Sequence, residues 1–214
     1  MPNTNTSASG GYLIPAASPA PLEDQALLRF FQQMVVGITG LPGNMVRPYW
    51  QAEPPDVPNA GVAWAAFKIT KRPNDEYPFV GRNPYGADDG ADHLQRHELL
   101  EILTSFYDTG VTGVSNSGGS ADYYSALFRD GLAIAQNREP LFNIGYGLVR
   151  MGEPVTVPVI FKLRWQNRVD LEWAVRREID RSYPVETLVA AQGDLYTDGG
   201  LPPEPFNVTD PETT

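Results

Sequence analysis

The segment VDLEWAVR, residues 169–176, alternates apolar and polar side chains without interruption. Successive side chains of a β-strand point to opposite faces, so this pattern predicts a strand with one buried and one exposed face. The apolar positions are Val169, Leu171, Trp173 and Val175. Residues 159–165 alternate in the same way. The run 159–179 is therefore either one bent strand or a hairpin that turns at Gln166 and Asn167.

The apolar face of such a strand must pack against another element, and two amphipathic helices are predicted to do this. The first spans residues 21–39, because Pro21 suits a first helical position and Gly40 follows the end. Its apolar face comprises Leu22, Ala26, Leu27, Phe30, Phe31, Met34, Val35 and Ile38. The second spans residues 121–137 and is capped by Ser120. Its predicted inner stripe comprises Tyr124, Leu127, Phe128, Gly131 and Ala135.

Further strands are predicted at residues 45–51, 61–70, 97–108 and 142–148, separated by proline and glycine. Residues 97–108 also fit a short helix, and residues 71–93 are predicted to form a long loop. This order of elements predicts an α+β fold. We expect a mostly antiparallel sheet of four to six strands with two main helices on one face.

The domain organisation follows from composition. Residues 1–20 predict a flexible N-terminal arm, residues 21–197 a single α+β domain, and residues 198–214 an extended acidic C-terminal tail. Each end carries a small apolar patch. We therefore expect both ends to order only against a neighbouring molecule. The N-terminal patch comprises Tyr12, Leu13 and Ile14, and the C-terminal patch comprises Leu201 and Phe206.

Charge and cysteine content exclude several classes of protein. The 214 residues carry 16 Lys and Arg against 26 Asp and Glu, a formal net charge of −10, and no cysteine. A disulfide framework and a thiolate metal site are excluded. Tight binding of duplex DNA at physiological salt is not expected, because phosphate binding needs clustered cations. No membrane-spanning or secretory segment is predicted. Residues 182–214 hold six acidic residues and no Lys or Arg.

Chemistry-bearing residues gather only between Asp88 and His97. The acids there are Asp88, Asp89 and Asp92, and the chain's two histidines are His93 and His97. This stretch lacks the ligand spacing of a calcium loop, so a polar turn is the expected structure. Two further sets of charges are expected on a solvated surface: the carboxylates Asp170 and Glu172, and the pair Arg176 and Arg177. We therefore assign no catalytic, cofactor-binding or metal-binding residue, and expect no cofactor.

Several segments together resemble tailed-phage neck and tail-terminator proteins. The resemblance covers about residues 22–190 and depends on the order and pattern of elements. Its segments are LEDQALLRFFQQMVVGITG, MVRPYWQAEPPDVP, GVAWAAFKIT, SFYDTG, SADYYSALFRDGLAIAQ followed by PLFNIG, and QNRVDLEWAVRREI.

The resemblance implies a non-enzymatic structural virion protein of the phage neck. It implies a ring, usually of six subunits, that caps the tail tube and joins it to a head-completion or collar protein. In contractile tails the ring also meets the tail sheath protein. DNA passes through the lumen without specific binding, which suits an acidic chain. The implied location is the virion tail or neck, and the host cytoplasm during assembly.

Other classes of function stay open on the sequence. A different tail-tube or head-tail connector component shares the acidity and the extended ends, and would polymerise into tubes instead of closing into rings. A small metal-dependent hydrolase that uses the Asp88–His97 region is a third possibility, which metal content and turnover would test. A bacterial cytosolic binding domain is a fourth.

Overall fold

The computed structural model describes residues 11–15, 22–51, 62–74, 78–81, 91–108, 120–161, 164–185, 190–195 and 204–209. The helices are α1 (Asp24–Thr39), α2 (Ala121–Ala133) and α3 (Ala135–Phe142), with a 3-10 turn η1 at Gly43–Met45. The strands are β1 (Val46–Pro48), β2 (Trp64–Lys71), β3 (Phe79–Gly81), β4 (Ala91–Asp108), β5 (Tyr146–Met151), β6 (Val155–Phe161), β7 (Arg164–Pro184), β8 (Ala190–Leu195) and β9 (Glu204–Thr209).

The chain divides into two compact units. Unit 2 comprises residues 19–79 and 95–180 and holds the three helices with most of the main sheet. Unit 1 comprises residues 1–18, 80–94 and 181–214, and includes the hairpin of β8 and β9. None of the helices in the described residues is long and apolar enough to cross a membrane.

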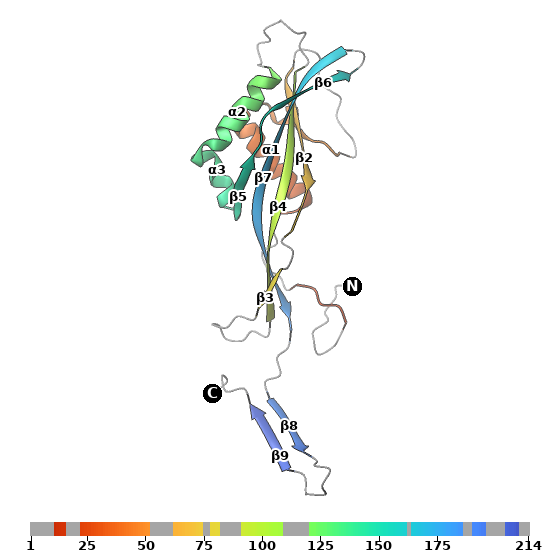
Figure 1. Ribbon diagram of the computed structural model, residues 1–214, viewed down its shortest axis with the longest axis vertical. Coiled ribbons are helices and arrows are strands. Elements are labelled where there is room, and N and C mark those ends of the chain that lie inside the picture. Colours follow the sequence, from red (N-terminus) through yellow and green to blue (C-terminus); the bar gives the residue numbers. More distant parts are fainter. Residues whose placement is uncertain are drawn as a thin grey trace. The chain divides into compact units, whose positions relative to one another are not determined.

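The main sheet has seven strands and is mixed, which confirms the α+β class and corrects the expected four to six strands. Its order is β1-β2-β4-β7-β5, with β3 paired to β4 and β6 paired to β7 (Figure 1). The pair β1–β2 is parallel, whereas β2–β4, β5–β7 and β6–β7 are antiparallel. One additional strand, β3, lies inside the segment predicted as a loop. The same prediction was wrong for residues 91–93, which begin β4.

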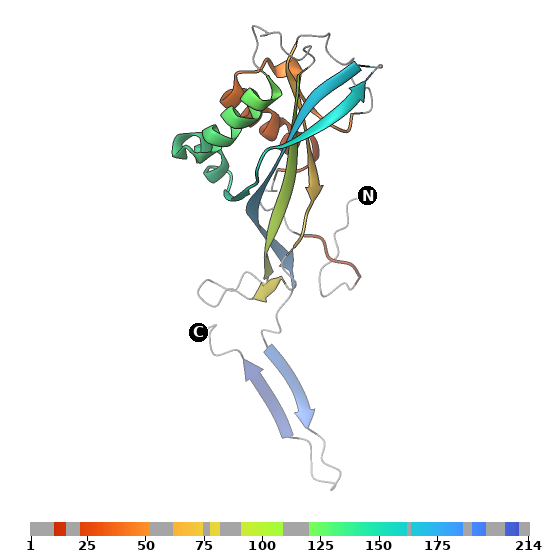
Figure 2. The ribbon, with the colours of Figure 1, turned by 45° about the horizontal axis from the view of Figure 1, so that its top comes forward.

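The helices pack on one face of this sheet, as predicted. The indole of Trp173 on β7 makes edge contacts with Phe31 of α1 and with Phe128 of α2, at centroid distances of 5.5 and 5.7 Å. Both helices therefore cover the same side of β7 (Figure 2). Burying such large side chains contributes about 1.5–3 kcal/mol each. The predicted inward sets of β4 and β7 are confirmed: Leu100, Ile102, Thr104, Phe106, Val169, Leu171, Trp173 and Val175 are all buried.

The helix boundaries differ from the prediction in two places. Helix α1 begins at Asp24, with Glu23 in extended conformation before it, and ends as expected at Gly40 (φ 71°). The second predicted helix is divided at Ile134, whose ψ of 127° is not helical, into α2 and α3. The buried stripe of α2 comprises Ala121, Ser125, Phe128 and Leu132.

Helices α1 and α2 approach each other closely at Gly131. A Cβ placed there would lie 2.3 Å from Ile38 Cγ2 of α1, so the crossing requires glycine. The sequence predicts Gly131 in the inner stripe, and this contact gives the reason for its small size.

Strands β5 and β6 run antiparallel to the same strand, β7, and are separated by residues 152–154. The Gly152 N–H donates to the Glu172 carbonyl at 2.7 Å, and a Cβ on Gly152 would lie 2.8 Å from that oxygen. The hairpin alternative for residues 159–179 is therefore realised, but with a different turn. Gln166 and Asn167 lie within β7, paired with Val159 and Pro158, and Phe161 pairs with Arg164.

Strands β8 and β9 form a separate two-stranded sheet in which Ala190 pairs with Thr209 and Leu195 with Glu204. The predicted division into an arm (1–20), a domain (21–197) and a tail (198–214) stays a prediction, because most residues of both ends lie outside the described residues. In the described segment 11–15, Tyr12 is 90% exposed.

Candidate functional site

A buried arginine lies at the centre of unit 2. Strand β7 continues its inward positions from Val175 to Arg177 and Ile179, so the Arg177 side chain enters the layer between sheet and helices. Only 1% of the residue is exposed. Glu98, 5% exposed, lies on β4 in phase with the inward Leu100. A buried charge is tolerated only when it is paired and hydrogen-bonded.

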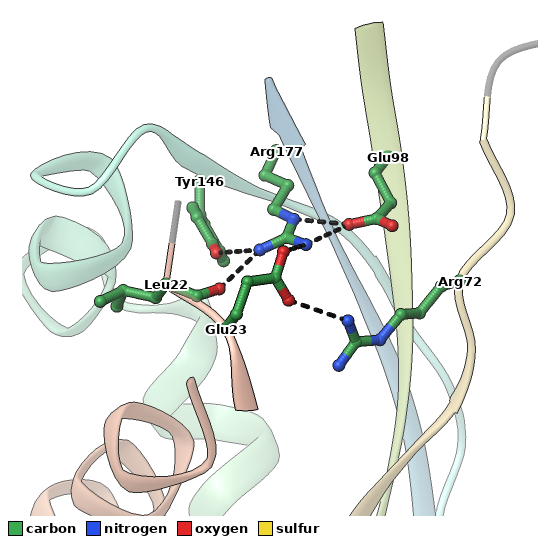
Figure 3. A network of polar contacts seen from close by, with 6 residues as sticks. All are labelled: Leu22, Glu23, Arg72, Glu98, Tyr146 and Arg177. Atoms are coloured by element: carbon green, nitrogen blue, oxygen red, sulfur yellow. Dashed lines mark hydrogen bonds and ion pairs between the residues drawn. The ribbon is translucent and has the colours of Figure 1, made fainter. Parts of the chain in front are cut away.

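The guanidinium of Arg177 is satisfied from four directions (Figure 3). Its Nε donates to Glu98 Oε2 at 2.6 Å, and its Nη2 forms an ion pair with the same carboxylate. Nη2 also donates to Glu23 Oε1 at 2.6 Å. Nη1 donates to the Leu22 carbonyl at 2.7 Å and to the Tyr146 hydroxyl at 2.9 Å.

The environment sets the charge of this cluster. Burial alone lowers the pKa of Arg177, but its hydrogen bonds to Tyr146 and Glu98 outweigh burial, and the net shift of the pKa is upward. Burial raises the pKa of Tyr146. Arg177 is therefore a permanent cation and Tyr146 a neutral phenol at any physiological pH.

The cluster fixes the start of α1 to the sheet. Glu23 immediately precedes α1. One of its carboxylate oxygens accepts a hydrogen bond from Arg177, and the other accepts one from Arg72, just after β2, at 3.0 Å. Leu22, two residues before α1, is held through its backbone carbonyl, which accepts a hydrogen bond from Arg177. All of these groups satisfy one another, so the arrangement positions the elements that carry them.

A second polar cluster lies on the face of the sheet away from the helices. The Tyr107 and Tyr49 hydroxyls are 2.6 Å apart, and Tyr49 donates to Ser105 Oγ at 2.9 Å. Ser105 donates to Asp170 Oδ1 at 2.5 Å, and Arg168 donates to both oxygens of Asp170 at 2.7 and 2.5 Å. Asp170 pairs in register with Val155, the first residue of β6. The cluster therefore holds the base of the β6–β7 hairpin.

The electrostatics of this second cluster agree with a structural role. Burial, together with the hydrogen bond to Tyr49, raises the pKa of Tyr107. The hydrogen bonds to Asp170 raise the pKa of Arg168. The ring of Tyr107 stacks on Trp64 at a centroid distance of 4.0 Å and an interplanar angle of 6°.

The hairpin itself presents an uncharged edge. Strand β6 and the preceding Pro154 read PVTVPVIF, without one charged residue. Val155 and Ile160 are 57% and 58% exposed. On its other side β6 has no paired strand among the described residues. Natural edge strands are usually protected by charge or by proline; β6 has Pro158 but no charge, so the residues on either side of this proline are a candidate contact surface.

The histidines and acids singled out in the sequence are separated along β4. Asp92, His93 and His97 lie on this strand, while Asp88 and Asp89 lie outside the described residues. His93 Nδ1 lies 3.0 Å from Ser182 Oγ, and His97 Nε2 lies 4.0 Å from Glu178 Oε2. Within the described part of the chain, no group of three or more His, Asp or Glu side chains is placed to hold a metal ion.

Two expectations about surface charges were wrong. Arg177 is buried in a cluster within its own chain, whereas Arg176 points to the exposed side. Asp170 is half-buried under Arg168 and Ser105, and only Glu172 is exposed as predicted. The sequence signal for the Arg177 cluster was its phase, because Glu98 and Arg177 occupy inward positions of two alternating strands.

The fold and these surfaces can be compared with known proteins. A family model described as "Phage neck terminator protein" matches residues 25–200, which is most of the chain. The chain therefore belongs to the phage neck terminator family, and the resemblance seen in the sequence is confirmed. This membership gives the protein a structural role in the tail or neck of a phage particle. No curated protein matches the chain.

Proposed function

We propose that the protein is a non-enzymatic subunit that closes into a ring of six copies at the head-facing end of the phage tail tube. The observation that carries this proposal is the family match over residues 25–200. In this position the ring contacts the tail tube protein on one side and a head-completion or collar protein on the other. In a contractile tail it also contacts the sheath protein. Assembly takes place in the host cytoplasm.

Physical features of the chain support this role. A heterologous interface closes into a ring when its rotation divides the circle, and such an interface needs two different surfaces on each copy. The uncharged edge of β6 is one candidate surface. The net charge of −10 suits a lumen through which DNA slides, because like charge weakens contact with phosphates.

The test is the state of the purified protein. Mass photometry across a dilution series should give one closed oligomer, and negative-stain images should show rings of uniform diameter. Tubes of unlimited length would instead favour a tail-tube component. A strict monomer at every concentration, even with tail tubes added, would contradict the proposal.

A further inference from the structure

The β8–β9 hairpin forms a two-stranded sheet separate from the main sheet. Its two strands pair with each other over six residues each, and with no other strand among the described residues. A two-stranded ribbon in water is marginally stable at best and gains stability from a third strand. Strand β8, AAQGDL, contains no proline, so each of its residues retains an N–H for pairing.

The free edge of β6 offers some of the groups that a further strand needs. Hydrogen-bonded and non-hydrogen-bonded pairs alternate along an antiparallel ladder such as β6–β7. A proline inside a sheet fits where its nitrogen faces the unpaired side, so Pro158 indicates that its nitrogen faces away from β7. By alternation, the N–H groups of Thr156 and Ile160 also face away from β7. An incoming strand therefore meets donors at Thr156 and Ile160, and none at Pro158.

Charge distinguishes this pair of surfaces from other pairings. Residues 154–169, which include β6 and the start of β7, carry Lys162, Arg164 and Arg168 and no acid. Arg168 is engaged by Asp170. Residues 182–214 carry six acids and no Lys or Arg. An acidic hairpin and a basic one attract each other, and two identical hairpins repel.

We propose that the β8–β9 hairpin of one copy adds to the free edge of β6 in a second copy, so that a sheet continues from subunit to subunit. The inference deepens the proposed ring and rests on it. Strand addition supplies the backbone hydrogen bonds, the exposed Val155 and Ile160 supply apolar contact, and the charges fix the partner. The contact is head-to-tail, because each copy offers one hairpin and one edge.

The absence of native cysteine allows a direct test in the full chain. Two single variants, Thr156→Cys on β6 and Gln192→Cys on β8, are given tags of different size, mixed and oxidised. A disulfide forms only when the two Cα atoms come within roughly 7 Å. We expect a mixed disulfide dimer, and at least a tenfold lower yield when Glu139→Cys on α3 replaces the β6 variant. Salt should slow the reaction, since it screens the opposite charges.

The outcomes separate this inference from the proposed function. Closed rings without the mixed disulfide would overturn the hairpin contact and leave the ring intact. A disulfide within single chains of the double variant Thr156→Cys/Gln192→Cys, at dilutions where the protein is monomeric, would overturn the contact between copies. A monomer at all concentrations without any disulfide would contradict both.

Discussion

Replacing Arg177 by methionine should unfold the protein at much lower denaturant. The change removes a guanidinium that is 1% exposed and leaves the carboxylate of Glu98 buried without its cation. Breaking a buried ion pair from one side costs about 3–5 kcal/mol, because the remaining charge has lost both water and partner. That is a large part of the roughly 5–15 kcal/mol that stabilises a typical domain.

The measurement is equilibrium unfolding in urea, followed by tryptophan fluorescence, to which the buried Trp173 contributes. With a slope of about 3 kcal/mol per molar urea, the midpoint should fall by about 1–2 M. Arg176→Met is the matched control, since it removes the same charge from the exposed face of the same strand. Its effect should stay below about 1 kcal/mol, as for other surface charges.

A double variant separates the orphaned charge from the lost packing. Arg177→Met combined with Glu98→Leu removes both ions, and replacing a buried pair by apolar side chains is often nearly neutral. The double variant should therefore recover at least half of the stability lost by Arg177→Met. The reasoning is refuted if Arg177→Met costs no more than Arg176→Met, or if the two changes are simply additive.

Three further substitutions test the packing and the second cluster. Gly131→Ala should destabilise the protein by about 1–3 kcal/mol, because the new Cβ meets Ile38. Gly37→Ala has open space around it and should stabilise α1 by about 0.5–1 kcal/mol. Equal effects of the two changes in thermal melts would contradict the close crossing of the helices. Gly152→Ala should cost about 1–3 kcal/mol, since its Cβ meets a strand carbonyl, and an unchanged urea midpoint would show that the β5–β6 junction relaxes freely. Because the pKa of Tyr107 is raised in the folded state, the unfolded chain loses the phenol proton first, and stability falls as the pH rises above about 10. Tyr107→Phe should make that fall shallower. Parallel curves of urea midpoint against pH for the two proteins would exclude Tyr107 as its cause.

Local patterns made most of the fold predictable. The alternation around Trp173 and the helical stripe around Phe31 each depend on neighbours in sequence, and both elements were predicted with the correct buried face. The parallel pairing of β1 with β2 could not be predicted, since three residues ending in Pro48 carry no signal of direction. The break at Ile134 was also missed, because a helical pattern continues through it.

The clusters were harder to predict because they join distant residues. Glu23, Glu98 and Arg177 are each ordinary surface residues by type, and only the phase of two strands marks the last two as inward. Nothing in the sequence shows that these residues meet. The hairpin turn was predicted at Gln166 and Asn167 because asparagine is common in turns. Asn167 instead lies inside β7, paired with Pro158.

The Arg177 cluster also affects how the chain is made. Arg177 contacts Leu22 and Glu23, which precede it in the chain by 155 and 154 positions. The ribosome therefore synthesises Glu23, Glu98 and Tyr146 before the arginine that all three contact. Bringing ends this distant together has an entropic cost that local helices do not bear, and pairings of this kind form late. A nascent or prematurely terminated chain without β7 has neither the strand between β4 and β5 nor a counterion for Glu98. We expect such fragments to stay unfolded and open to proteases, so that only full-length copies are available for building a particle.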